Sequence, residues 1–308
     1  LRMDWSHGHN HAVVNGVGRI GFMKGGTAAF WKDEEMADVF ARQAVKFMET
    51  NKSGPFFLYF STHSIHVPRV VGPRFAGKTG MGPRGDSIVS FDSSVGAILE
   101  TLDRLKLADN TLVLLTSDNG PVLDDGYNDE AATRIGKHRP AGPLRGGKYS
   151  AYEGGTRVPW IVRWPARVRA ESPPRVSHAL ICQVDLFASL AKLVGQTLDD
   201  RDAPDSFDLL AALCGESPAG REWLVEQGGA QRGLRVGTWK YVTPPNRPAN
   251  AKKGKASSED VRPASQGELF DLNSDLGESV DLAQKFPERS QAMRNRLEEI
   301  AKQGRSRP

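Results

Sequence analysis

The sequence predicts an α/β protein with a mostly parallel central sheet. Two short apolar runs, residues 56–60 and 112–115, have the length and the flanking turn residues of strands that are buried on both faces. Between them, residues 87–105 place apolar side chains on one face at helical spacing. The order strand, helix, strand is that of a right-handed βαβ unit, so we expect the two strands to lie parallel in one sheet.

The remaining elements follow from the same patterns. An acidic first turn and an apolar stripe predict a helix over residues 33–50. Further candidate elements are a strand at 160–162, a helix at 185–194, strands at 223–226, 233–236, 238–242 and 268–272, and a final helix after residue 286. The composition shifts near residue 215, so we predict a large domain part over residues 1–215 and a small α+β subdomain over residues 216–308.

Composition excludes several classes of protein. Of the 308 residues, 39% are hydrophobic and 25% are charged, which is typical of a soluble globular protein. A net charge of +4 is too small to indicate nucleic-acid binding, and no apolar stretch is long enough to span a membrane. Two cysteines cannot form a disulfide framework, and we expect both to be small buried residues. We expect no signal peptide within these 308 residues.

A candidate metal site follows the apolar run 112–115. The next polar residues include Asp118 and Asn119. Ligands bind outside the carboxyl ends of strands in open α/β sheets, and calcium and magnesium prefer oxygen ligands. Asp-Asn-Gly is also common in turns, so these residues alone leave a metal site and a simple turn equally open.

A glycine-rich segment lies downstream of this pair. Residues 142–148 read Gly-Pro-Leu-Arg-Gly-Gly-Lys and include Arg145 and Lys148, and residues 152–159 read Tyr-Glu-Gly-Gly-Thr-Arg-Val-Pro. Glycines let the backbone approach a ligand closely, and a lysine supplies a point charge for a compact anion. The spacing around Lys148 is not that of a Walker phosphate-binding loop.

Histidines form two further candidate groups. His63 and His66 follow the predicted strand 56–60, in the position that Asp118 holds after the other run. His7, His9 and His11 alternate near the start, but this spacing matches no common set of metal ligands, and we interpret them as part of a polar loop or strand.

The combination of Thr-Ser-Asp-Asn-Gly at 116–120 with the two glycine-rich motifs resembles the formylglycine-dependent sulfatases of the arylsulfatase A type. The resemblance implies an alkaline-phosphatase-like α/β sandwich, with residues 1–215 as the later part of its catalytic domain. It implies a calcium ion bound by Asp118 and Asn119. His66 and Lys148 would be catalytic residues, with His63 and Arg145 as weaker substrate-binding candidates.

Other parts of the family pattern are missing from these 308 residues. The family nucleophile is a formylglycine made from the cysteine of a Cys-x-Pro-Ser-Arg motif, but Cys182 precedes Gln-Val-Asp and Cys214 precedes Gly-Glu-Ser-Pro. An early aspartate pair and a Gly-Lys-Trp-His segment are also missing. We therefore expect an N-terminally truncated sulfatase that is inactive in isolation, with the formylglycine in the missing part.

The resemblance implies that the parent protein hydrolyses a small-molecule or carbohydrate sulfate ester and is periplasmic or secreted. It implies neither a nucleic-acid partner nor a membrane. Two alternatives remain open: a metal-dependent phosphodiesterase or phosphonate hydrolase of the same superfamily, and a non-catalytic module that binds sulfated glycans.

Overall fold

The structure of the protein is a computed structural model, and it describes residues 13–14, 19–21, 32–168, 176–244 and 267–307. The chain forms two compact units. The first comprises residues 1–111 and 123–138, and the second comprises residues 112–122 and 139–308. The alternating histidines His7, His9 and His11 lie outside the described residues.

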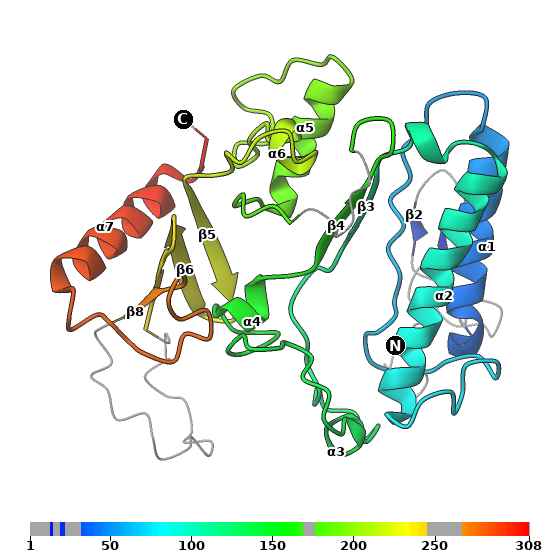
Figure 1. Cartoon of the computed structure of the whole chain (residues 1–308), viewed down its shortest axis with the longest axis horizontal. Coiled ribbons are helices and arrows are strands. Elements are labelled where there is room, and N and C mark those ends of the chain that lie inside the picture. Colours follow the sequence, from blue (N-terminus) through cyan, green and yellow to red (C-terminus); the bar gives the residue numbers. More distant parts are fainter. Residues whose placement is uncertain (1–12, 15–18, 22–31, 169–175, 245–266, 308) are drawn as a thin grey trace. The chain divides into compact units, whose positions relative to one another are not determined.

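Two long helices dominate the first unit. These are α1 (Asp33–Asn51) and α2 (Gly82–Arg104), which lie side by side (Figure 1). Both predicted helices are therefore confirmed, although α2 begins five residues earlier than predicted. The unit also contains the antiparallel pair β1 (Val13–Val14) and β2 (Arg19–Gly21), the 3-10 turn η2 (Ala108–Asn110) and the short helix α3 (Ala131–Arg134).

The predicted strand at residues 56–60 is wrong. These residues have no strand pairing in the structure, and Phe57 and Tyr59 are 71% and 81% exposed. A strand exists only where a neighbouring backbone accepts and donates its hydrogen bonds, and the described residues offer no such neighbour here. The predicted parallel pairing of this segment with residues 112–115 is therefore not found among them.

The second unit begins with the apolar run that precedes Asp118. This run forms β3 (Val113–Thr116), which pairs antiparallel with β4 (Trp160–Arg163). Both predicted strands are confirmed, but β3 is half-buried rather than buried on both faces. The short helix α4 (Glu153–Thr156) precedes β4. The unit continues with η3 (Gln183–Asp185), α5 (Leu186–Leu193) and α6 (Leu210–Leu213).

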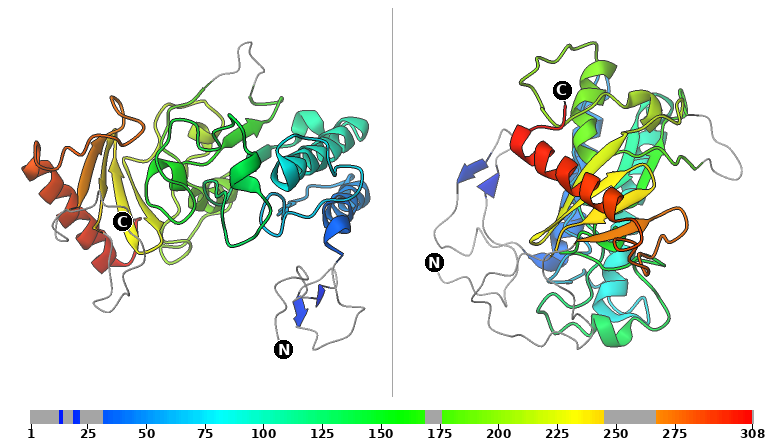
Figure 2. Two further views of the ribbon diagram at one scale, coloured as in Figure 1. Left: turned by 90° about the horizontal axis from the view of Figure 1, so that it is seen from below. Right: turned by 90° about the vertical axis from the view of Figure 1, so that its left-hand side faces the viewer.

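A four-stranded antiparallel sheet closes the second unit, and it is formed by the four strands that the sequence predicted there. Its order is β5 (Trp223–Gly228), β6 (Gln231–Val236), β7 (Trp239–Val242) and β8 (Glu268–Asp271). Figure 2 shows α7 (Pro287–Gln303) lying across one face of this sheet. The core between them consists of buried apolar residues: Leu234, Tyr241, Leu269, Ala283, Met293, Leu297 and Ile300.

The opposite face of this sheet carries part of the glycine-rich segment. Ala151 packs there against Val242, Phe270 and Leu272, and all four side chains are buried. The part of the stretch between β3 and β4 around Ala151 thus packs onto the C-terminal sheet within the second unit. A domain boundary near residue 215 stays a prediction.

Candidate active site

Asp118 and Asn119 directly follow β3, as the sequence predicted. The Asp118 side chain is exposed, and one of its carboxylate oxygens, Oδ1, accepts the N–H of Asn119 at 2.9 Å. The amide nitrogen of Asn119 donates to the carbonyl of Gly120 at 2.8 Å, so its oxygen is the atom left to meet a ligand. Gln183 supports the strand end by donating to the Thr116 hydroxyl at 3.1 Å.

Gly120 joins this turn to the glycine-rich segment. Its N–H donates to the carbonyl of Gly155 at 2.8 Å. A Cβ atom on Gly120 would lie 1.8 Å from the carbonyl oxygen of Gly154, so no larger residue fits. The close approach of the two backbones explains why glycines occur on both sides.

Lys148 lies where the glycine-rich segment meets the same turn. Its N–H donates to the carbonyl of Pro121 at 2.9 Å, and a Cβ atom on Gly147 would lie 2.5 Å from that carbonyl oxygen. The Lys148 ammonium is 5.0 Å from the centre of the Tyr149 ring. The structure therefore brings the segment of Lys148 and the turn of Asp118 and Asn119 together through their backbones.

Arg145 is engaged inside the second unit. Its guanidinium donates to the carbonyl of Glu278 at 3.0 Å and lies 4.0 Å from the centre of the Tyr152 ring. It is also 3.6 Å from the Glu268 carboxylate. These contacts give Arg145 a structural function, while its contact with substrate stays a prediction.

His63 and His66 belong to the first unit. His66 is exposed, and its Nδ1 lies 2.7 Å from the carbonyl of Val67. His63 packs edge-on against Phe40, with 6.1 Å between the ring centres. Arg69, three residues after His66, binds Asp129 at 2.6 Å and fixes this segment within the unit. Convergence of the histidines with Asp118 stays a prediction.

The donors of Asp118 and Asn119 suit a hard cation. A carboxylate and an amide oxygen at one turn are ligands of the type that calcium takes. Within the described residues, no group of three or more His, Cys, Asp or Glu side chains is close enough to hold a metal ion. The pair therefore fits two of the six to eight oxygens of a calcium site.

The cysteines have no catalytic surroundings. Cys214 is buried and Cys182 is half-buried, and neither is in a disulfide. Burial raises the pKa of both thiols, which keeps them protonated at neutral pH. The predicted burial is therefore confirmed for Cys214, whereas Cys182 is only half-buried.

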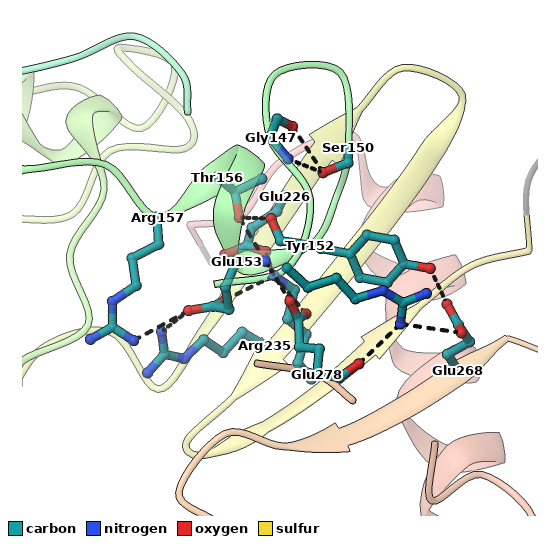
Figure 3. A network of polar contacts seen from close by, with 12 residues as sticks. Gly147, Ser150, Tyr152, Glu153, Thr156, Arg157, Glu226, Arg235, Glu268 and Glu278 are labelled. Carbon is teal, nitrogen blue, oxygen red and sulfur yellow. Dashed lines mark hydrogen bonds and ion pairs between the residues drawn. The ribbon is translucent and has the colours of Figure 1, made fainter. Parts of the chain in front are cut away.

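A buried charged cluster that was not predicted from the sequence lies behind the glycine-rich segment. Its members are Glu153, Glu226 and Glu278, whose carboxylates lie around the Lys240 ammonium. Figure 3 shows the three glutamates close together within this network. Lys240 lies on β7 and Glu226 on β5, and a polar residue on a strand usually faces solvent. The signal available in the sequence was that Lys240 lies in a predicted strand, on the face that also carries Val242.

The chain is similar to known proteins over most of its length. A family model described as Sulfatase matches residues 8–196, which is more than half of the chain. An N-acetylgalactosamine-6-O-sulfatase of Bacteroides thetaiotaomicron is 46% identical over 301 residues, covering 97% of this chain and 58% of that protein. Human arylsulfatase A is 37% identical over 170 residues, covering 55% of this chain and 31% of that protein.

A solved structure from work on the metabolism of glycosaminoglycans by Bacteroides thetaiotaomicron is also similar. It has a TM-score of 0.81 at 44% sequence identity and covers 96% of this chain and 60% of the solved one. These neighbours confirm the α/β class and the alkaline-phosphatase-like fold. The chain thus spans little more than half the length of the bacterial relative. Sulfatases generally use a metal ion and a formylglycine.

Proposed function

The chain belongs to the sulfatase family, and we propose that the complete protein containing it hydrolyses sulfate esters. The observation that carries the proposal is the hydrogen bond from the Lys148 N–H to the Pro121 carbonyl. It fastens the segment that bears a cation to the turn that bears Asp118 and Asn119. The candidate anion-binding residue Lys148 and the candidate metal ligands Asp118 and Asn119 thus lie on adjacent backbone segments.

In this proposal, Asp118 and Asn119 contribute two ligands to a calcium ion. The bound cation would withdraw charge from the sulfuryl oxygens. The Lys148 ammonium would contact those oxygens and stabilise negative charge that grows in the transition state. His66 is the second proposed catalytic residue, with His63 and Arg145 as weaker candidates for substrate binding.

The nucleophile is not assigned to these residues. Neither Cys182 nor Cys214 lies in the Cys-x-Pro-Ser-Arg motif from which formylglycine is made, and burial keeps both thiols protonated. We therefore propose that residues 1–308 alone turn over no sulfate ester. The nucleophile and the remaining calcium ligands would have to come from other residues of the complete protein.

A sulfated carbohydrate is the proposed substrate class, since the bacterial relative is named an N-acetylgalactosamine-6-O-sulfatase. We also propose a periplasmic or secreted location. No helix among the described residues combines the length and apolarity needed to cross a bilayer.

The test uses the complete gene product that contains these 308 residues, coexpressed with a formylglycine-generating enzyme. N-acetylgalactosamine 6-sulfate, an aryl sulfate, an aryl phosphodiester and an aryl phosphonate are assayed after chelation and after calcium is restored. Calcium-dependent release of sulfate, with the carbohydrate preferred, is the expected result. Turnover of only the phosphorus esters would instead identify a phosphodiesterase or phosphonate hydrolase, and glycan binding without any turnover would identify a binding module.

A further inference from the structure

A buried ammonium connects the C-terminal sheet to the glycine-rich segment. Lys240 projects from β7, and its side chain is completely buried. Its Nζ lies 2.8 Å from Oε1 of Glu153 and 2.7 Å from Oε2 of Glu226 on β5. Glu278 is the third carboxylate, at 3.6 Å (Figure 3). A lysine without solvent contact must be compensated by such partners, because an unpaired buried charge is very costly.

The ammonium stays charged in this site. Burial acts to lower the pKa of Lys240, but Glu226, Glu153 and Glu278 outweigh it and raise that pKa overall. Burial likewise acts to raise the pKa of Glu153, but Lys240, together with Arg235 and Arg157, lowers it. Lys240 and Glu153 thus form a true ion pair.

Glu278 binds the same segment at two points. Its Oε2 accepts the N–H of Glu153 at 2.7 Å, and its carbonyl accepts from Arg145 at 3.0 Å. Tyr152 adds a hydrogen bond to the Glu268 carboxylate at the start of β8. Residues at both ends of the segment 145–153 are therefore held by the C-terminal part of the chain.

Lys148 lies inside this doubly held segment. The Gly154 N–H donates to the Arg145 carbonyl at 2.7 Å, which closes the segment into a loop. Within it, the Ser150 hydroxyl donates to the Gly147 carbonyl at 2.9 Å. Gly228, at the end of β5, packs so closely that a Cβ atom there would lie 2.1 Å from the carbonyl carbon of Ser150. Little freedom is left for the backbone of Lys148 once these contacts form.

We propose that Lys240, Glu153 and Glu278 are positioning residues, through which the C-terminal sheet fixes Lys148 against the Asp118 turn. The inference rests on the proposed function only for the role of Lys148 in sulfate hydrolysis. A buried ion pair adds little stability over well-packed apolar residues, but its partners cannot separate without a large penalty. Such a pair therefore suits the fixing of a loop, since a small displacement of a charge-stabilising group lowers the rate.

The experiment compares Lys240→Met and Glu153→Gln with wild type in the complete protein. Lys285→Met is the matched control, because it removes the same charge from an exposed position in the same unit. We expect kcat to fall at least tenfold for both variants, with KM changed much less. A merely structural role would lower the amount of folded enzyme without changing the kcat of the folded fraction.

A second measurement does not depend on activity. Amide hydrogen exchange at Lys148 and Gly154, whose N–H groups bind Pro121 and Arg145, should accelerate at least tenfold in both variants. Exchange in α1, which belongs to the other unit, should stay at the wild-type rate. If Lys240→Met does not fold, Glu153→Gln, which keeps the side-chain shape, and the double variant, which removes both charges, supply the same readouts.

The outcomes separate the two proposals. Unchanged exchange and unchanged kcat in a folded Lys240→Met or Glu153→Gln protein would overturn the positioning role. Accelerated exchange with unchanged kcat would also overturn it, because Lys148 would then tolerate a loose loop. If the wild-type protein cleaves no sulfate ester but loop exchange still accelerates in the variants, the proposed function would be wrong. The positioning of Lys148 would then still stand.

Discussion

Two segments share one sequence pattern but differ in the structure. Each consists of an apolar run followed by polar candidates: residues 112–115 before Asp118, and residues 56–60 before His63 and His66. The first run pairs with β4, and its turn is hydrogen-bonded to the glycine-rich segment. The second forms no strand pairing among the described residues, and Phe57 and Tyr59 are largely exposed. An apolar run predicts the capacity to be a strand, whereas a partner decides whether the strand forms.

The largest expected effect comes from removing the carboxylate at the built turn. Asp118→Ala in the complete protein should lower kcat/KM for a sulfate ester by about a thousandfold or more, because a charged metal ligand is lost. Steady-state kinetics with calcium titration measures the loss. Asp124→Ala, an exposed aspartate nearby in sequence, is the control and should keep full activity. Calcium-dependent activity in Asp118→Ala would remove this residue from the metal site.

Gly120→Ala should be the most destabilising of the single-methyl changes. The added Cβ would lie 1.8 Å from the Gly154 carbonyl oxygen, so the two segments must separate. We expect a loss of about 3 kcal/mol in the free energy of unfolding, measured with urea. Gly96→Ala is the matched control, since nothing lies within 4 Å of a Cβ atom there. Equal stabilities of the two variants would mean that the turn and the glycine-rich segment are not in contact.

Lys148→Ala should act on the chemical step. If its ammonium contacts the sulfuryl oxygens, kcat falls on the order of a hundredfold while KM changes less. Lys137→Ala, at an exposed position, provides the comparison. An unaltered kcat in Lys148→Ala would leave the glycine-rich segment with a structural function only.

Glu278 gives the built region a distinctive pH dependence. Burial raises the pKa of its carboxyl to about 7, against the opposing effects of Lys240 and the Glu153 N–H. Because the folded-state pKa lies above the unfolded one, the stability that this group contributes is full below about pH 4.5 and is lost as pH rises through 7. The pKa of Glu153 is lowered, so the stability that it contributes is lost as the pH falls. The pKa of Lys240 is raised, so the stability that it contributes is lost only at high pH.

The matching variant is Glu278→Gln, which keeps an acceptor for the Glu153 N–H but cannot ionise. Between pH 5 and pH 8, wild type should lose on the order of 2 kcal/mol more unfolding free energy than the variant. Urea unfolding at a series of pH values measures the difference. Parallel curves for the two proteins would show that Glu278 does not titrate in this range.

The smallest effect is expected in the unpaired segment. Phe57→Ser should change the free energy of unfolding by less than about 0.5 kcal/mol, because that side chain is mostly exposed. Phe270→Ser, at a fully buried position on β8, should cost about 3 kcal/mol or more. A large cost for Phe57→Ser in the complete protein would mean that this segment is covered there, and the contrast between the two segments would disappear.

The sequence by itself determined the elements whose signals are local. Helical periodicity located α1, α2, α5 and α7, and short β-rich runs located β3, β4 and the C-terminal sheet. The side chains of Asp118, Asn119 and Lys148 could be singled out because strand-end polar residues and glycine-rich motifs are contiguous in the chain. The assignment of roles to them stays a prediction.

Tertiary structure decided what depends on residues distant in sequence. Residues 56–60 have the composition of a strand, but hydrogen-bond partners come from elsewhere in the chain, so periodicity could not reveal their absence among the described residues. Lys240 is buried only because Glu153, 87 positions earlier, and Glu226 on β5 come to meet it. A lone lysine in a short strand is normally solvated, and its partners become visible only when the chain has brought them within contact distance, where burial makes the pairing obligatory.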